Sequence, residues 1–419
     1  MNLALLAYRS LVNRRSTAIL TVVSIAISVT LLLGVEKIRI NARDSFANTI
    51  SGTDLIVGGR SGSVQLLLYS IFRIGNATNN ISWESYQAIT SKPGIKWTIP
   101  ISLGDSHRGY RVMGTNQDYF EYYRHGNKRK LELAAGETFK DYFDVVIGAE
   151  VADALNYQVG EDVIVTHGIS SSSITDHKDK PFHVSGILKP TGTPVDRTLH
   201  ISLEGIEAMH LGWQNGVPIP NANTSVKRAR KSQLQPKSIT AFLLGLENKI
   251  TAFKLQRFIN EYPNESLLAI FPGVALHELW GLMSIAEKAL LAISSFVVVA
   301  ALIGMLAVSL AGLNERRREI AILRSVGAGY RHIIGLLVVE SSLLTMAGIM
   351  TGLILLYSGL ILAQPLIESS YGLHIPVTLP GLRELGMLSI LAAAGILVGL
   401  IPAYRAYRNS LLDGMSSKT

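Results

Sequence analysis

Residues 18–34 read AILTVVSIAISVTLLLG, an uncharged stretch that follows the basic pair Arg14 and Arg15. A transmembrane helix needs about 20 mostly apolar residues, so this stretch crosses a bilayer with a small extension. A cleaved signal peptide is the alternative, because it also places an apolar run after basic residues. The run is longer than a usual signal-peptide core, however, and the VEKIRINARD at 35–44 offers no small-residue cleavage site. We therefore expect a retained transmembrane helix over 18–34.

Three further apolar runs lie near the C-terminus, at residues 289–313, 343–363 and 385–402. The whole chain is 48% hydrophobic and only 17% charged, and soluble domains are usually about 25% charged. This layout predicts a membrane protein with four transmembrane α-helices and a large extracytoplasmic α+β domain inserted between helices 1 and 2. The remaining predicted segments are 1–17, 35–288 with helical stalk ends, 314–342, 364–384 and 403–419.

The basic residues predict the orientation, because Lys and Arg in short segments resist translocation. Segments 1–17, 314–332 and 403–419 contain eleven of them, whereas the short loop 364–386 contains Arg383 alone. We expect a multi-pass protein of the bacterial inner membrane with both termini cytosolic and the large domain periplasmic. The net charge of +8 is then mainly a topological bias, and we expect no nucleic-acid partner.

The segment between the first two spans changes in periodicity. Short β-like runs alternate with helix-like stretches, which is typical of an α+β domain. The β-like runs are 54–57, 96–101, 145–147, 163–165 and 240–244, and the helix-like stretches are 83–90, 149–155 and 249–262. The chain has no cysteine, which excludes disulfides, thiolate metal sites and Cys nucleophiles.

Apolar residues recur at helical spacing on both sides of this domain, and they predict a stalk. One stripe follows the first span, and a heptad-like seam precedes the second. The helix ends could simply pack on the outer domain, or the pair could move as a stiff unit. The predicted stalk residues are Ile38, Ala42, Phe46, Leu276, Leu279, Met283 and Ala286.

Between the second and third spans, residues 314–333 read NERRREIAILRSVGAGYRHI. The apolar and charged residues separate onto two sides of a helix, which the triplet Gly327-Ala328-Gly329 interrupts. Such a helix could anchor the chain to the membrane surface, or it could dock a soluble partner.

This basic stretch resembles the signature of the FtsX-like permease family of ABC transporters, which includes MacB-type and lipoprotein-releasing permeases. Looser similarities are VIGAEVADALNYQVGEDV at 146–163, HVSGIL at 183–188 and IPAYRAYR at 401–408. Two features depart from the family: the N-terminal ATPase domain of MacB is not present, and NSLLD at 409–413 replaces the usual proline-containing tail.

The resemblance implies a permease that forms a homodimer or pairs with a paralogue, binds a separate ABC ATPase subunit and transmits motion mechanically. ATP and Mg would then belong to that ATPase, with no cofactor on this chain. The coupling region by resemblance comprises Glu315, Arg316, Arg318, Glu319, Leu323, Arg324, Gly327 and Ala328. The sequence contains no Gly-Lys dipeptide, so it lacks a P-loop, and we expect no enzymatic activity.

Such a permease would drive export or extraction of an extracytoplasmic substrate, with a periplasmic adaptor or outer-membrane component as a further candidate partner. The alternative is a non-transport regulator that activates a periplasmic partner such as a cell-wall hydrolase.

Five other residues stand out near the last two spans. Glu340 is an acid beside a span, where ionisable side chains are costly. Two interpretations are open for this residue: a functional role, or an interfacial position in which it is hydrogen-bonded to a neighbour or to water. Glycine pairs at i, i+4 allow close helix packing, within the chain or across a dimer. These pairs are Gly348 with Gly352 and Gly395 with Gly399. No catalytic set is visible, and the histidines lack the spacing of a metal site.

Overall fold

The computed structural model describes residues 3–126, 128–167, 180–214, 217–218, 234–315, 322, 325–371 and 378–415. The chain forms two compact units, each of which we describe by itself. The helical unit comprises Met1–Asn41, Ser284–Ile367 and Ile375–Thr419, and the inserted domain comprises Ala42–Met283 and Glu368–His374. Helices α2, α10 and α12 contribute residues to both units.

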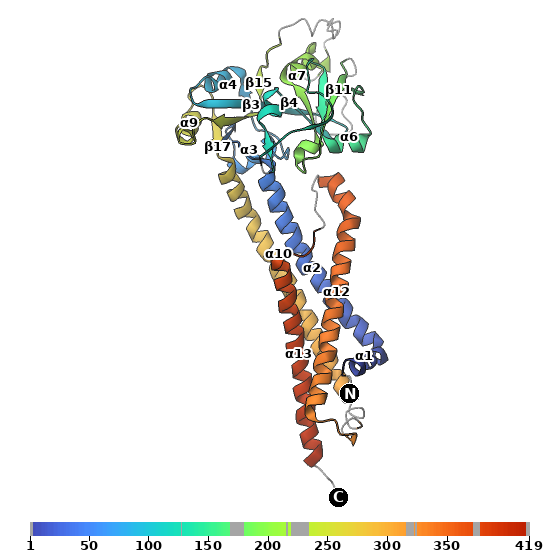
Figure 1. Ribbon diagram of the computed structural model, residues 1–419. Coiled ribbons are helices and arrows are strands. Elements are labelled where there is room, and N and C mark those ends of the chain that lie inside the picture. The colour runs from blue at the N-terminus through green and yellow to red at the C-terminus, as the bar shows by residue number, and fades with distance from the viewer. Residues whose placement is uncertain are drawn as a thin grey trace. The chain divides into compact units, whose positions relative to one another are not determined.

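Four long helices run side by side in the helical unit, preceded by the short helix α1 (Figure 1). Their bounds are Leu3–Asn13 for α1, Arg15–Thr49 for α2, Pro272–Glu315 for α10, Tyr330–Tyr371 for α12 and Leu382–Met415 for α13. In the described residues, four segments are long and apolar enough to cross a membrane: Arg15–Asn41, Pro272–Leu313, Tyr330–Gln364 and Leu382–Ala406. The predicted fold class, with a domain inserted between the first and second membrane helices, is confirmed.

Glycines allow the helices of this unit to approach closely. Gly348 and Gly352 of α12 face α2. A Cβ added at Gly348 would stand 2.6 Å from the Ile25 Cβ, and one added at Gly352 would stand 2.8 Å from the Ala26 carbonyl oxygen. Gly395 and Gly399 of α13 face α12, and an added Cβ would overlap the side chains there. These side chains belong to Thr345 and Ser341. All four predicted packing glycines therefore make contacts within the chain.

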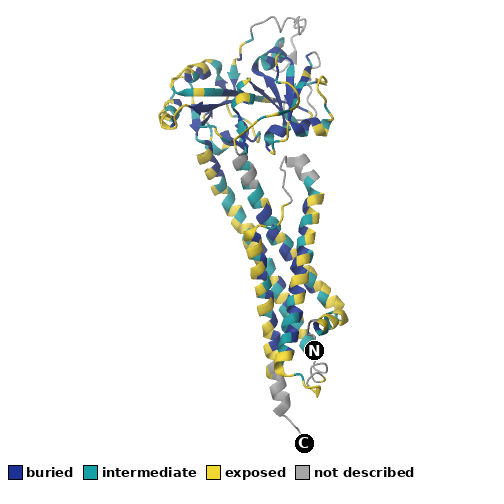
Figure 2. Cartoon of the chain, viewed as in Figure 1, coloured by how far each residue is buried: buried dark blue, intermediate teal, exposed yellow. Residues whose placement is uncertain are grey.

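The inserted domain is built on one mixed sheet, whose strands are mostly buried (Figure 2). The sheet order is β17-β1-β16-β3-β4-β12-β8-β11-β7, with β10 paired to β3 and β9 paired to β11. Strands β12 and β4 pair in parallel, as do β11 and β8, and the other pairs are antiparallel. The bounds are β1 Leu55–Gly59, β3 Ile95–His107, β4 Tyr110–Thr115, β7 Leu133–Gly136, β8 Asp144–Ile147, β9 Asp162–Val163, β10 Thr166–His167, β11 Phe182–Leu188, β12 Thr198–Ser202, β16 Ala241–Leu246 and β17 Leu267–Ile270.

Three short strand pairings and several helices complete the domain. The short strands are β2 Ile81–Ser82, β5 Arg124–His125, β6 Arg129–Lys130, β13 Trp213–Gln214, β14 Val217–Pro218 and β15 Ser238–Ile239. The helices are α3 Ser63–Ser70, α4 Trp83–Thr90, α5 Asp118–Tyr122, α6 Ala149–Leu155, α7 Leu203–His210 and α9 Thr251–Asn260, with a 3-10 turn at Pro194–Arg197. Serine hydroxyls cap two of them: Ser82 accepts from the Ser85 N–H at the start of α4, and Ser202 accepts from the Gly205 N–H at the start of α7.

The apolar segment around α3 belongs to the core of this domain. Its residues Leu66, Leu67 and Tyr69 are fully buried, in one cluster with side chains from the sheet. Phe46 of α2 packs edge-on against Phe72, with ring centroids 4.5 Å apart. The first residues of α10 join the same cluster, so both stalk helices contribute to the core of the inserted domain.

Candidate functional site

The helical unit has two ends with different chemistry. We call the end at which α1, the connection between α10 and α12, and the last turns of α13 lie the basic end. At the opposite end, which we call the insertion end, α2 leaves the unit, α10 enters it, and α12 connects to α13. The predicted coupling residues that the structure describes, Glu315, Gly327 and Ala328, belong to the basic end.

The turn before α12 exposes apolar side chains at the basic end. We call residues 325–330 the docking turn. Val326 is 83% exposed and Tyr330 is 53% exposed, while the nearby Ile322 is 62% exposed. Gly327 has φ +97°, a conformation that a residue with a side chain rarely adopts, and no heavy atom lies within 4 Å of the position of an added Cβ. The turn therefore exposes apolar side chains on a backbone whose conformation at Gly327 favours glycine.

Only part of the predicted coupling region falls within the structure. Glu315 is the last residue of α10, and Gly327 and Ala328 lie just before α12. The predicted positions Arg316, Arg318, Glu319, Leu323 and Arg324 lie outside the described residues.

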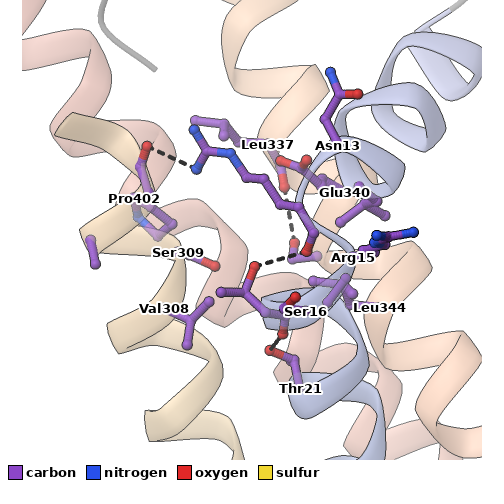
Figure 3. A pocket seen from close by; sticks show the side chains of 17 residues that line it. Asn13, Arg15, Ser16, Thr21, Val308, Ser309, Leu337, Glu340, Leu344 and Pro402 are labelled. Atoms are coloured by element: carbon purple, nitrogen blue, oxygen red, sulfur yellow. Dashed lines mark hydrogen bonds between the residues drawn. The ribbon is translucent and has the colours of Figure 1, made fainter. Parts of the chain in front are cut away.

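A cavity of about 410 Å³ lies inside the basic end. Figure 3 shows its lining: Asn13 and Arg15 from the turn between α1 and α2, Ser309 from α10, Glu340 from α12 and Pro402 from α13. Segments far apart in the sequence thus meet around one hollow.

Glu340 lines this cavity and is only 7% exposed. It takes part in a polar interaction within the protein. The predicted acid is therefore buried between helices at the basic end. A charged group at such a depth needs polar neighbours, and Ser309 and Ser341 also line the cavity.

Arg14 joins the turn between α1 and α2 to the end of α10. Its Nη1 donates a hydrogen bond to the Gly312 carbonyl oxygen at 3.1 Å, and its own carbonyl accepts from the Thr17 hydroxyl at 3.0 Å. In the sequence, Arg14 stands out as part of a basic pair, and the family resemblance places it in an N-terminal helix at the membrane beside the ATPase. The contact with Gly312 joins positions 298 residues apart, so no local pattern indicates it.

A network of charged residues, which no pattern in the sequence predicted, occupies the insertion end. Glu36 is fully buried, and its carboxylate accepts from Arg39 and lies 3.2 Å from the Arg383 Nε. Lys37 donates to the Thr378 carbonyl oxygen at 2.8 Å and lies 3.8 Å from the Glu384 carboxylate. The only signal in the sequence is the group of charged residues that directly follows the first apolar run.

The predicted stalk residues differ in their environment. Leu276 and Leu279 are buried, Phe46 is partly buried against the core of the inserted domain, and Met283 is half-buried. Two positions depart from the expected apolar packing: Ile38 is 53% exposed, and Ala286 is also exposed. The reason is geometric, because both side chains lie on faces of α2 and α10 that the described residues leave uncovered. For Ala42 the helical backbone is described, and its side chain lies outside the described part.

Among the described residues, no group of three His, Asp or Glu side chains could hold a metal ion. Buried histidines of the inserted domain instead bond to the backbone. His200 Nδ1 donates to the Val146 carbonyl oxygen at 3.2 Å, and His107 Nδ1 lies 2.7 Å from the Ile164 carbonyl oxygen.

Comparison with known proteins gives two family matches that together extend over most of the chain. Residues 18–232, about half of the chain, match the MacB-like periplasmic core domain, and residues 291–411 match the FtsX-like permease C-terminal region. No curated protein matches the chain by sequence.

Two solved structures are similar to the inserted domain. One is the periplasmic region of MacB from Actinobacillus actinomycetemcomitans, with 10% identity and a TM-score of 0.33, covering 56% of this chain and 94% of that chain. The other is the extracellular domain of the noncanonic ABC-type transporter YknZ from Gram-positive bacteria, with 14% identity and a TM-score of 0.29, covering 52% of this chain and 99% of that chain.

Proposed function

Because this chain belongs to the FtsX/MacB-type permease family and is an ABC transporter-type membrane subunit, we propose that it couples ATP hydrolysis by a separate ATPase subunit to movement of its inserted domain. This movement would drive export or extraction of an extracytoplasmic substrate. ATP and Mg would bind to the ATPase, and this chain would supply the docking surface and the moving helices.

The observation that carries this proposal is the exposed docking turn. Val326 and Tyr330 expose apolar surface beside Gly327, whose backbone conformation shapes the turn. The arginine-rich residues 316–324 adjoin it in the sequence. Apolar anchors with a charged rim are the usual composition of a protein interface. A soluble ATPase on the cytosolic side is the partner that suits this surface.

The packing of the helical unit supports transmission of motion from this turn. Helix α12 begins at the docking turn and packs through Gly348 and Gly352 on α2. Helix α10 is continuous from Pro272 to Glu315. Its first residues belong to the core of the inserted domain, and its last residue belongs to the basic end. Closely packed helices move as bodies rather than deform, which suits mechanical coupling.

The orientation and assembly belong to the same proposal. Basic residues at both termini and in 314–332 favour a cytosolic basic end, and hence a periplasmic inserted domain, in a bacterial inner membrane. Exposed apolar residues on α10 suit a second permease copy or a paralogue. Val274 is 65% exposed and Leu282 is 63% exposed.

Substitutions in the docking turn test the coupling. We expect Val326→Asp and Gly327→Leu to preserve membrane insertion and to lower copurification of the host's ABC ATPase by about tenfold or more, as for an interface hot spot. Gly359→Leu is the matched control. It adds the same side chain to α12, where no heavy atom lies within 4 Å of an added Cβ, and it should copurify the ATPase normally. Equal ATPase recovery from all variants would refute the coupling assignment.

A second measurement separates transport from regulation. Stimulation of the ATPase by a periplasmic substrate, in the reconstituted complex, supports export or extraction. If instead the complex retains a cell-wall hydrolase and activates it on ATP hydrolysis, the chain acts as a transmembrane regulator.

A further inference from the structure

We propose that the inserted domain binds a compact anionic group, a phosphate or a carboxylate, in a cavity beside Arg111. This site goes beyond the coupling function, because it gives the domain a ligand class of its own. If no anion binds at this site, the proposed role of the docking turn still stands, because the two proposals are tested on different residues.

The cavity has a volume of about 280 Å³ and lies where the segment after α3 meets β3 and β4. Of the described residues that line it, Arg111 is the only charged one and none is acidic. Asn76, Asn80 and Thr240 supply the other polar side chains. A hollow of this size is small for an organic ligand and sufficient for a single ionic group.

Neutral acceptors hold the Arg111 guanidinium in place. Its Nη2 donates to the Gly75 carbonyl oxygen at 2.9 Å, and Nη1 and Nη2 both lie 3.2 Å from the Asn76 Oδ1. These bonds use three of the five N–H groups that arginine carries. Two N–H groups therefore remain without an acceptor in the described part of the chain. The side chain is oriented, and no carboxylate of the described residues neutralises its charge.

Amide groups add further donors to the same cavity. Because the Asn76 Oδ1 accepts from Arg111, its NH2 group is left to donate elsewhere. The Asn80 Nδ2 reaches the Ser238 hydroxyl only at 3.5 Å, a distance at which a hydrogen bond is weak. Thr240, by contrast, is satisfied, because its hydroxyl accepts from the Leu103 N–H at 2.9 Å. A fixed guanidinium with amide donors and no lining carboxylate is the donor set that recognises an anion.

A second guanidinium lies on the same side of β4. The Arg73 Nη2 contacts the Met113 sulfur, and Met113 follows Arg111 by two residues in the strand, so both side chains project from one face. The Nε and Nη1 of Arg73 are buried, and the polar group beside this guanidinium is the Tyr119 hydroxyl rather than a carboxylate of the described residues. Burial lowers the pKa of Arg111, and the positive charge of Arg73 lowers this pKa further. A bound anion would relieve this repulsion.

The backbone of Arg73 is strained as well. Its φ is +60°, a left-handed conformation that a long side chain adopts only where the surroundings enforce it. The strained residue thus holds a second buried positive charge near Arg111. No stabilising ion pair in the described residues explains this arrangement.

Calorimetric titration of the full chain in maltoside micelles tests the site, with inorganic phosphate and acetate as separate probes at constant ionic strength. We expect saturable binding of at least one probe to the wild type, and the probe that binds identifies the ionic group. Arg111→Gln should weaken this binding at least tenfold. Arg129→Gln removes the same charge from an exposed position on β6 outside the cavity, and it should bind as the wild type does.

Asn76→Asp provides a second variant in case Arg111→Gln does not fold. It places a carboxylate against the Arg111 guanidinium and so supplies the missing counter-ion within the chain. We expect this variant to fold and to lose binding of the probe at least tenfold. The site is refuted if neither probe gives saturable heat with the wild type, or if Asn76→Asp binds the probe with wild-type affinity.

Discussion

The Arg39 guanidinium donates two hydrogen bonds to the buried carboxylate of Glu36, at 2.9 Å from Nε and 2.7 Å from Nη2. Both residues lie on α2, one helical turn apart. Arg383, at the start of α13, lies 3.2 Å from the same carboxylate, and Glu287 of α10 lies 3.8 Å from the Arg39 Nη1. Three helices of the unit are therefore joined around one buried carboxylate at the insertion end.

We expect Arg39→Gln to destabilise the helical unit by about 3–5 kcal/mol, because it leaves the carboxylate of Glu36 buried with one remaining, largely exposed arginine. Chemical unfolding in micelles measures this change. Lys140→Gln is the control: it breaks an exposed ion pair with Glu137, and such pairs contribute about 0–1 kcal/mol. Similar losses in the two variants would show that burial does not strengthen the Arg39–Glu36 pair.

Gly352 should not tolerate a larger side chain. An added Cβ would stand 2.8 Å from the Ala26 carbonyl oxygen and 2.8 Å from the Val29 Cβ, so α12 would have to move away from α2. We expect Gly352→Val to lower the free energy of unfolding by about 1–3 kcal/mol or more. Gly359→Val, which adds the same group to α12 in open space, serves as the control in the same unfolding assay. Equal stability of the two variants would contradict close packing of α12 on α2.

Local sequence patterns predicted helix bounds and membrane spans, whereas contacts between residues far apart in the sequence could not be predicted. Helix α4 begins at Trp83 as expected, because Ser82 caps it, and α6 ends at Leu155, where Asn156 takes a left-handed conformation. The four apolar spans were visible for the same reason, since each is a continuous run. The contacts of Glu36 with Arg383 and of Arg14 with Gly312 join distant positions, and a single sequence carries no periodic signal for such pairs.

The inserted domain should lose stability in acid because of His200. Burial and the positive charge of Arg73 lower the pKa of His200 to about 3, while an unfolded histidine titrates near 6.5. Between these values the unfolded chain binds more protons, so stability is unaffected above about pH 6.5 and falls as pH decreases toward 3. The slope is at most about 1.4 kcal/mol per pH unit for this one group.

Replacing His200 tests this assignment. His200→Asn keeps a donor for the Val146 carbonyl oxygen, and we expect a shallower loss of thermal stability between pH 6.5 and 4. His107 has a lowered pKa for the same main reason, burial, so part of the acid sensitivity should remain. The exposed His277, changed to Asn, is the control and should leave the pH profile of the melting temperature unchanged. An unaltered slope in His200→Asn would assign the acid sensitivity to other groups.

Arg14 is the residue through which we expect the N-terminal turn to act on coupling, if the proposed function holds. Its hydrogen bond to the Gly312 carbonyl oxygen fixes this turn to the last turns of α10, directly beside the connection to the docking turn. Arg14→Gln should leave the ATPase bound, because the docking turn is untouched, and should lower substrate-stimulated ATP hydrolysis about 2- to 30-fold, which corresponds to 0.5–2 kcal/mol of coupling. The neighbouring Arg15 is exposed, and Arg15→Gln removes the same charge without removing this contact. Copurification and ATPase assays on both reconstituted variants separate the two effects. Equal losses of stimulation would assign the effect to charge alone, because among the described residues the Gly312 carbonyl oxygen accepts from the side chain of Arg14 and not from that of Arg15.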